Sequence, residues 1–165
     1  MKEKVVIITG STSGIGFGIA KKFASSGAKI VINGFASAAQ VDSIIQELKS
    51  LGALDVLFDS ADLSKPVEID TMFKNIINRF QTIDILINNA GIQFVSPIED
   101  FPPEKWEAIM RVDLIASFYT IKNAIPRMKK NKWGRIINIA SAHALVASPF
   151  KSAYVAAKHG MLGLT

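Results

Sequence analysis

Tyr154 and Lys158 lie four residues apart in a stretch of helical periodicity, so the sequence places their side chains on one helix face. A phenol with an ordinary pKa of about 10 is a poor base at neutral pH, but an ammonium group one turn away favours the phenolate. Tyr154 could then take a proton from an alcohol as hydride leaves its carbon, or return one to a ketone. Ser141 stands 13 residues before Tyr154, at the end of a predicted strand, where its hydroxyl could polarise the substrate oxygen. Because Tyr-x-x-x-Lys pairs are common on helix surfaces, the other motifs decide whether this pair is catalytic.

A glycine-rich loop follows the first apolar run, with the spacing Gly-x-x-x-Gly-x-Gly from Gly10 to Gly16. A glycine at the end of a strand allows a sharp turn. Glycines at a helix start let the backbone approach a pyrophosphate, whose charge meets free N–H groups and the positive end of the helix dipole. The strand before this loop and the helix after it favour phosphate binding over a plain turn. The predicted cofactor contacts here are Gly10, Thr12, Ser13, Gly14, Ile15 and Gly16.

Apolar runs of strand length alternate with longer helical stretches, which predicts a parallel sheet covered by helices on both faces. Ser64 is the expected N-cap of the third helix, and Gly27 and Gly52 fall where helices should stop. We therefore expect an α/β fold, a Rossmann-like doubly wound parallel sheet with about five strands, forming one domain over residues 1–165. The predicted strands are Val5–Ile8, Lys29–Asn33, Asp55–Asp59, Ile83–Asn88 and Arg135–Ala140, and the predicted helices 14–26, 38–51, 65–80, 104–130 and from 152 onward.

The composition excludes several classes of function. There is no cysteine, so disulfides, thiolate catalysis and cysteine-ligated zinc are ruled out, and two histidines are too few to suggest a metal site. The net charge of +5 comes from scattered basic residues, which argues against a nucleic-acid partner. The first apolar run is far shorter than the ~20 residues of a membrane span and lacks a signal-peptide cleavage region, so we expect a cytoplasmic protein without membrane attachment.

Taken together, the glycine loop, Ser141 and the Tyr154/Lys158 pair resemble the short-chain dehydrogenase/reductase family. Asn88-Asn89-Ala90-Gly91 after the fourth strand and Asp62-Leu63 after the third belong to the same resemblance. It implies that Asn89, Ala90 and Gly91 line the cofactor cleft, that Asp62 and Leu63 lie at the adenine, and that Lys158, with Tyr154, also holds the ribose of the nicotinamide. Asp62 could equally be an ordinary cap before the next helix.

The chain departs from the family at Asp113, where the family has an asparagine that completes the catalytic set. The resemblance implies that this asparagine's carbonyl holds a water leading to the lysine, and that its amide pins a helix kink. A carboxylate cannot donate the amide's hydrogen bond unless it is protonated. A nearby anion would also change the electrostatics of the lysine. We therefore expect impaired or retuned catalysis.

The end of the second strand, Asn33-Gly34-Phe35, bears on the choice of cofactor. NAD-preferring enzymes usually place an acid there for the ribose hydroxyls, and NADP enzymes an arginine for the 2′-phosphate. This chain has neither. The missing cation favours NAD, with Phe35 among the predicted cofactor contacts.

Within the family the chain resembles the D-3-hydroxybutyrate dehydrogenases, over Asn33–Phe35, Gly91–Gln93, Ile136–His143 and Lys151–Gly160. The resemblance implies NAD-dependent interconversion of D-3-hydroxybutyrate and acetoacetate. It also implies that Gln93, His143 and Lys151 hold the carboxylate of a small 3-hydroxy or 3-oxo acid beside Ser141 and Tyr154. Each of the three could alone be a surface or packing residue. The rival within the family is an NADPH-dependent 3-oxoacyl reductase.

The last residues, Gly160–Thr165, are largely apolar, whereas natural termini are usually polar. This indicates a domain that is incomplete at its C-terminus, with the family's later strands and substrate-closing segment missing. The alternative to an active enzyme is then a truncated, inactive nucleotide-binding remnant. The resemblance further implies a homo-oligomer, a tetramer when full length. We also expect the fifth strand to be an unprotected edge and the isolated chain to be poorly soluble.

Overall fold

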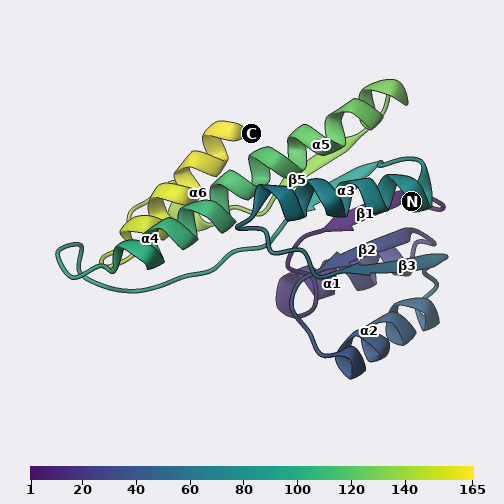
Figure 1. Ribbon diagram of the computed structural model, residues 1–165, viewed down its shortest axis with the longest axis horizontal. Coiled ribbons are helices and arrows are strands. Elements are labelled where there is room, and N and C mark those ends of the chain that lie inside the picture. The colour runs from purple at the N-terminus through teal and green to yellow at the C-terminus, as the bar shows by residue number, and fades with distance from the viewer.

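The computed structural model describes residues 1–165, in which strands and helices alternate along the chain (Figure 1). All five predicted strands and all the predicted helical regions are confirmed, with ends that shift by a few residues. The strands are β1 (Val5–Ile8), β2 (Lys29–Asn33), β3 (Asp55–Asp59), β4 (Ile85–Asn88) and β5 (Arg135–Asn138). The helices are α1 (Gly14–Ala24), α2 (Ala38–Ser50), α3 (Pro66–Phe80), α4 (Pro103–Met110), η1 (Arg111–Ile115), α5 (Ala116–Lys130), η2 (Ala142–Ala144) and α6 (Ser152–Leu164).

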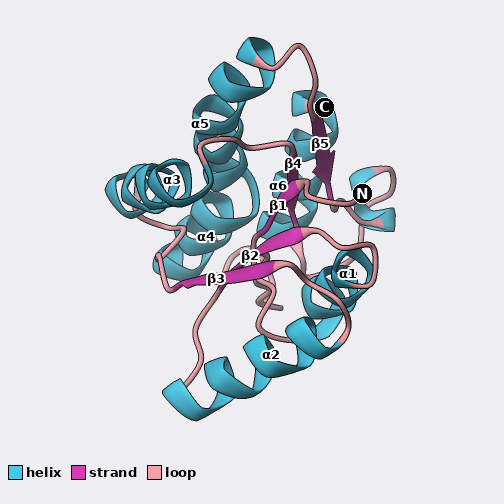
Figure 2. Cartoon of the chain, turned by 90° about the vertical axis from the view of Figure 1, so that its right-hand side faces the viewer, coloured by secondary structure: helices cyan, strands magenta, loops and turns pink.

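The five strands form one parallel sheet in the order β3-β2-β1-β4-β5, as Figure 2 shows. The chain runs outward from β1 to β3 and then crosses to the other side of β1 to form β4 and β5. The strand order thus reverses between β1 and β4. In an open α/β sheet, the crevice at the carboxyl ends of the strands flanking this point is where ligands bind. The predicted Rossmann-like α/β fold is confirmed.

Each central strand is buried on both faces, because its alternate side chains enter two separate cores. Val5 and Ile7 of β1 pack with α3 and α5, whereas Val6 and Ile8 pack with α1 and α2. All four of these residues are fully buried. This explains why the strands read as continuous apolar runs, and the two helical layers keep the crevice rigid from both sides.

The predicted helix over 104–130 consists of three segments, α4, η1 and α5. The middle segment, η1, is a π-helix, which inserts an extra residue per turn and is often found at functional sites. Asp113 lies at its centre and is completely buried. Sequence periodicity could not reveal this segment, because one wider turn hardly disturbs the apolar pattern over such a length.

The prediction of Ser64 as the N-cap of α3 was wrong. The N-cap is Lys65, and Pro66 occupies the first turn. The backbone N–H of Ser64 instead donates to the Asp62 carboxylate at 2.9 Å, which closes a turn before the helix. Gly27 and Gly52 follow the ends of α1 and α2 with φ angles of 71° and 110°, as expected for helix termination.

On the other side of the sheet from β3, α6 packs against α4 and η1 (Figures 1 and 2). A small core of Phe101, Ile109, Ala153 and Ala157 holds these helices together. β5 is an edge strand, with Ile137 43% exposed, as the sequence predicts. No helix of the chain has the length and apolar character that crossing a membrane requires.

Candidate nucleotide-binding and active site

The loop between β1 and α1 packs closely against the segment after β4. Gly10 has a φ of 59°, and a Cβ added there would lie 2.8 Å from the Ala90 Cα. A Cβ on Gly16 would overlap the Gly10 carbonyl oxygen and the Asn89 amide nitrogen. Only glycine therefore permits the backbone packing that shapes this loop. Ser13, the N-cap of α1, makes no side-chain capping bond, so the first turn of α1 keeps its N–H groups without a side-chain acceptor.

Thr9 and Asn89 connect the ends of β1 and β4 at the switch point. The Thr9 Oγ1 accepts hydrogen bonds from the backbone N–H groups of Asn89 at 3.0 Å and Ala90 at 3.1 Å. In return, the Asn89 side-chain amide donates to the carbonyl oxygens of Thr9 and Gly10, both at 2.9 Å. These neutral bonds hold the two halves of the crevice at a set separation.

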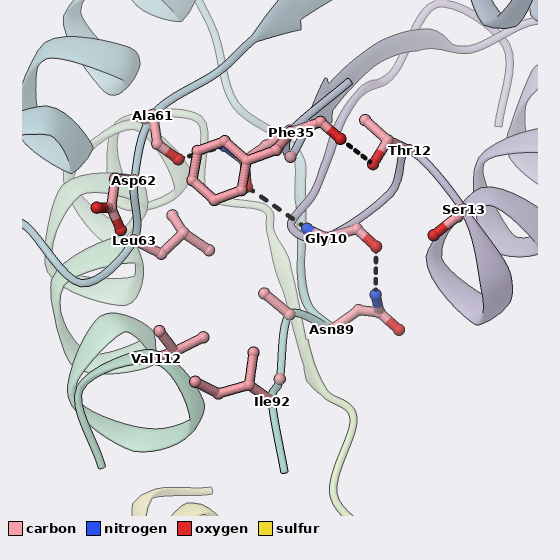
Figure 3. Close-up of a pocket in the computed structure, with 14 residues that line it drawn as sticks. Gly10, Thr12, Ser13, Phe35, Ala61, Asp62, Leu63, Asn89, Ile92 and Val112 are labelled. Atoms are coloured by element: carbon pink, nitrogen blue, oxygen red, sulfur yellow. Dashed lines mark hydrogen bonds between the residues drawn. The ribbon is translucent and has the colours of Figure 1, made fainter. Parts of the chain in front are cut away.

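A cavity of about 370 Å³ lies at the carboxyl ends of β1 to β4 (Figure 3). It brings together residues that are up to 102 positions apart in the sequence, from Gly10 to Val112, and nine of the predicted cofactor contacts line it. These nine are Gly10, Thr12, Ser13, Phe35, Asp62, Leu63, Asn89, Ala90 and Gly91. Sequence reasoning missed five further lining residues, namely Asn33, Gly34, Ala61, Ile92 and Val112. All of these except Asn33 are next in sequence to a predicted site residue, and this proximity could have indicated them.

The walls of this cavity combine flat apolar surfaces with polar groups at one rim. Phe35 stands at the end of β2 and is 74% exposed, with Leu63 beside it in Figure 3. Val112 and Ile92 lie across from Phe35 in the same view. The Asp62 carboxylate accepts hydrogen bonds from Ser64, which lower the pKa of Asp62 below its ordinary value. A planar heterocycle between apolar side chains, near one anionic rim residue, suits this arrangement.

Asn33 shapes the cavity from behind. Its side chain is 1% exposed and donates to the carbonyl oxygens of Asp59 at 3.2 Å and Ala61 at 3.0 Å. The Asn33 backbone also exchanges hydrogen bonds with Ser11. Asn33 thereby ties the ends of β1, β2 and β3 into one rim, a role that its sequence position alone did not indicate.

A second cavity of about 260 Å³ opens beside the first and contains the predicted hydride-transfer pair. Lys158 of α6 is 3% exposed, and its Nζ donates to the Ile139 carbonyl oxygen at 3.2 Å. The same Nζ lies 5.5 Å from the centroid of the Tyr154 ring. The cavity is lined by Ile15, Asn89, Gly91, Ile92, Gln93, Ile139, Ala140, Tyr154 and Lys158. Asn89, Gly91 and Ile92 line both cavities, so the two adjoin one another.

The other predicted substrate residues flank this second cavity without lining it. Ser141 is the N-cap of η2, and its Oγ accepts from the backbone N–H of His143 at 3.2 Å. The His143 ring stands edge-to-face with Tyr154 at 6.3 Å between centroids, and its Nδ1 is buried without a hydrogen-bond partner. Lys151 is the N-cap of α6, one turn before Tyr154. Of the expected carboxylate contacts, only Gln93 lines the cavity itself.

The remaining predicted residues lie close by. Gly14 opens α1 at the loop, Gly16 packs beneath it, and Ile15 belongs to the second cavity instead of the first. Asp113 lies under the second cavity, with its Oδ2 3.6 Å from the Lys158 Nζ. Burial raises the pKa of the Asp113 carboxyl, while the Ile92 N–H and Lys158 act in the opposite direction.

Comparison with known proteins places this geometry in context. A D-beta-hydroxybutyrate dehydrogenase of Rhizobium meliloti is 57% identical over 162 residues, which are 98% of this chain and 63% of that protein. A D-beta-hydroxybutyrate dehydrogenase of Cupriavidus necator is 52% identical, covering 100% and 63%. A 3-oxoacyl-[acyl-carrier-protein] reductase of Staphylococcus aureus is 31% identical, covering 98% and 65%. The chain thus spans about two thirds or slightly less of the length of these relatives.

A solved structure of a metagenomic short-chain oxidoreductase in complex with NADP superposes on the chain with a TM-score of 0.93. It is 29% identical in sequence, and the match covers 99% of this chain and 73% of that one. The profile described as short chain dehydrogenase matches residues 4–165. The family uses NAD or NADP to transfer hydride. The adjoining pair of cavities, with its glycine loop at one end and Tyr154 and Lys158 at the other, therefore lies in a chain that belongs to the short-chain dehydrogenase family.

Proposed function

We propose that the protein is an NAD-dependent oxidoreductase that interconverts D-3-hydroxybutyrate and acetoacetate, with Tyr154 as the acid/base. The observation that carries this proposal is that the two cavities share part of their lining. Asn89, Gly91 and Ile92 line both, so a dinucleotide bound along the glycine loop can extend its reactive end to Tyr154 and Lys158. We also take residues 1–165 as a single nucleotide-binding domain.

The residues present suit a dinucleotide. Gly10 and Gly16 leave room where any Cβ would clash, and the first turn of α1 offers N–H groups to a pyrophosphate. Tyr154 and Lys158 would hold the nicotinamide end. When bound, the cofactor supplies the acceptor or donor of the hydride.

The chain's own residues move the proton. In alcohol oxidation, the Tyr154 phenolate would take the proton of the substrate hydroxyl while Ser141 donates a hydrogen bond to the substrate oxygen. In ketone reduction, the Tyr154 phenol would return this proton. Lys158, held by the Ile139 carbonyl oxygen, keeps a positive charge close to the ring.

A small carboxylate substrate is supported by the polar groups around the second cavity. Gln93 lines it, His143 contacts the Tyr154 ring edge, and Lys151 lies one turn before Tyr154. A cation together with neutral donors suits a small anion. The relatives at 57% and 52% identity, which are D-beta-hydroxybutyrate dehydrogenases, support the same substrate.

The preference for NAD rests on the end of β2. Phe35 projects there without any basic residue among the lining of the first cavity, which leaves no cation for a 2′-phosphate. Asp62, on the same wall, would repel one. The rival function is NADPH-dependent 3-oxoacyl reduction, which the Staphylococcus aureus relative and the NADP-bound neighbour support.

The test is to measure D-3-hydroxybutyrate-dependent NADH formation, with NADP and a 3-oxoacyl thioester plus NADPH as rival substrates. Replacing the phenol by Tyr154→Phe should lower turnover at least ~100-fold, because the acid/base is lost. NADH binding, followed by its fluorescence, should persist. Tyr119→Phe, the other tyrosine of the chain, is the matched control and should leave turnover unchanged.

Turnover only with NADPH and a 3-oxoacyl substrate would replace this proposal with the rival. NADH binding without turnover of either substrate would indicate a nucleotide-binding protein that is not itself an enzyme. Full turnover in Tyr154→Phe would contradict the assignment of the acid/base.

A further inference from the structure

Asp113 is the only buried carboxylate in contact with the hydride-transfer pair. Its side chain is 0% exposed, and its Oδ1 accepts the backbone N–H of Ile92 at 2.8 Å. Its Oδ2 has no hydrogen-bond partner, and the nearest cation is the Lys158 Nζ at 3.6 Å. One carboxylate oxygen is thus used to hold the cavity wall, and the other faces the lysine.

Among the groups around Asp113, Lys158 is the one that can balance its negative charge. Lys158 faces it from α6, with the Tyr154 ring beyond Lys158, and Gly91 faces it from the segment after β4. A Cβ on Gly91 would lie 3.0 Å from Asp113 Oδ2 and 3.4 Å from Lys158 Nζ, so the glycine leaves no side chain between the two groups. In η1 itself, Arg111 is exposed and lies 3.8 Å from Glu107. His143 lies beyond Tyr154, against the tyrosine ring.

We propose that the Asp113 carboxylate neutralises Lys158, so that Tyr154 stays protonated to a higher pH than it would beside an unpaired lysine. This inference rests on the role of Tyr154 in the proposed function. With Lys158 neutralised, Tyr154 can donate a proton over a wider pH range. Ketone reduction, which needs the phenol, then extends to more alkaline pH. Alcohol oxidation, which needs the phenolate, begins only at more alkaline pH.

The proposed effect operates with the Asp113 carboxyl in its ionised form. Burial raises the pKa of Asp113, but a carboxyl ordinarily loses its proton roughly six pH units below a phenol. The Ile92 N–H and Lys158 both stabilise the anion. An ionised Asp113 carboxylate places a full negative charge opposite Lys158.

The test is a spectrophotometric titration of phenolate absorbance in the chain and in Asp113→Asn. Asparagine keeps the shape and the oxygen that accepts the Ile92 N–H, while it removes the charge and places an amide NH₂ at the position of Oδ2. The chain has two tyrosines, so the same titration on Tyr154→Phe isolates the signal of Tyr119. We expect Asp113→Asn to lower the ionisation midpoint of Tyr154 by about one pH unit, the size of effect that a neighbouring charge produces.

An unchanged or higher midpoint in Asp113→Asn would overturn the proposal. If that variant fails to fold, the carboxyl carbon-13 shift of Asp113 in the unaltered chain decides the question. A carboxyl that is still protonated where Tyr154 titrates would overturn the proposal, and an ionised one would support it.

Neither measurement needs substrate or cofactor, so a failure of the proposed function and a failure of this inference are distinguishable. A lowered midpoint without any turnover of D-3-hydroxybutyrate would uphold the charge pairing and refute the activity. If turnover is present, Asp113→Asn should also move the acid-side limb of the D-3-hydroxybutyrate oxidation profile to lower pH, with NADH affinity unchanged. A purely structural role for Asp113 would not move that limb.

Discussion

The two ends of the crevice differ in whether their buried polar side chains are hydrogen-bonded. At the nucleotide end, the side chains of Thr9, Asn33 and Asn89 are neutral and all make hydrogen bonds. At the catalytic end, Asp113 Oδ2, His143 Nδ1 and Ser152 Oγ are buried without hydrogen-bond partners. Asp113 and Lys158 are also ionisable and nearly inaccessible to water.

This difference follows from what each end must do. A nucleotide end built from neutral, satisfied groups is rigid and hardly depends on pH. Each unsatisfied buried group costs about 1–3 kcal/mol, so the catalytic end is a source of instability that the rest of the fold offsets. Those of these groups that titrate make the catalytic end respond to pH.

The largest expected effect is at the nucleotide end, in Gly16→Ala. A Cβ there would overlap the Gly10 carbonyl oxygen and the Asn89 amide. These two groups are hydrogen-bonded to each other, so they cannot easily move aside. We expect NADH binding to be lost and the free energy of unfolding to fall by about 3 kcal/mol. NADH titration and urea denaturation measure these two quantities.

Gly18→Ala is the matched control for that substitution. Gly18 lies on the same helix with open space around its Cβ position and no positive φ. Alanine there should preserve NADH binding and raise the free energy of unfolding by up to about 1 kcal/mol. Equal losses in both variants would mean that helix composition, and not close packing of the loop, controls this end.

An intermediate effect is expected for Thr9→Val, which keeps the shape of the side chain and removes its oxygen. The N–H groups of Asn89 and Ala90 would lose their acceptor. The free energy of unfolding should fall by about 2 kcal/mol, by the same amount at acid and neutral pH because no titrating group is involved. Thr9→Ser, which keeps the oxygen, should recover most of the loss. If the loss of unfolding free energy in Thr9→Val depended on pH, the proposed difference between the two ends would be contradicted.

The smallest expected effect is the pH dependence of stability at the catalytic end. Burial raises the pKa of folded Asp113 above its ordinary value of 3.8, so folding favours the protonated carboxyl. The stability that Asp113 contributes is complete below its unfolded pKa and is lost as pH rises through the folded pKa. The unfolding free energy of Asp113→Asn, minus that of the unaltered chain, should therefore increase with pH over this window. Urea denaturation at a series of pH values measures it, and a decreasing difference would show that Lys158 outweighs burial.

The sequence alone was sufficient for the elements and their order. Continuous apolar runs such as Val5–Ile8, separated by helical stretches, specify a doubly wound parallel sheet, because strands buried on both faces must be apolar throughout. The glycine loop, the Asn-Asn-Ala-Gly segment and the Tyr154/Lys158 pair were recognisable because their spacing is local. Local spacing is set by backbone geometry and survives without knowledge of the fold.

Other features arise from contacts between distant segments, and only the tertiary structure decided them. Asn33 was overlooked because its partners, Asp59 and Ala61, lie more than 20 residues away. The sequence marked Asp113 as an unusual residue, but the π-helical turn and the packing of α6 bring its Oδ2 to 3.6 Å from Lys158. The energy of a buried charge depends on its exposure to water and on its distance to the opposite charge. Both quantities exist only once the chain has folded.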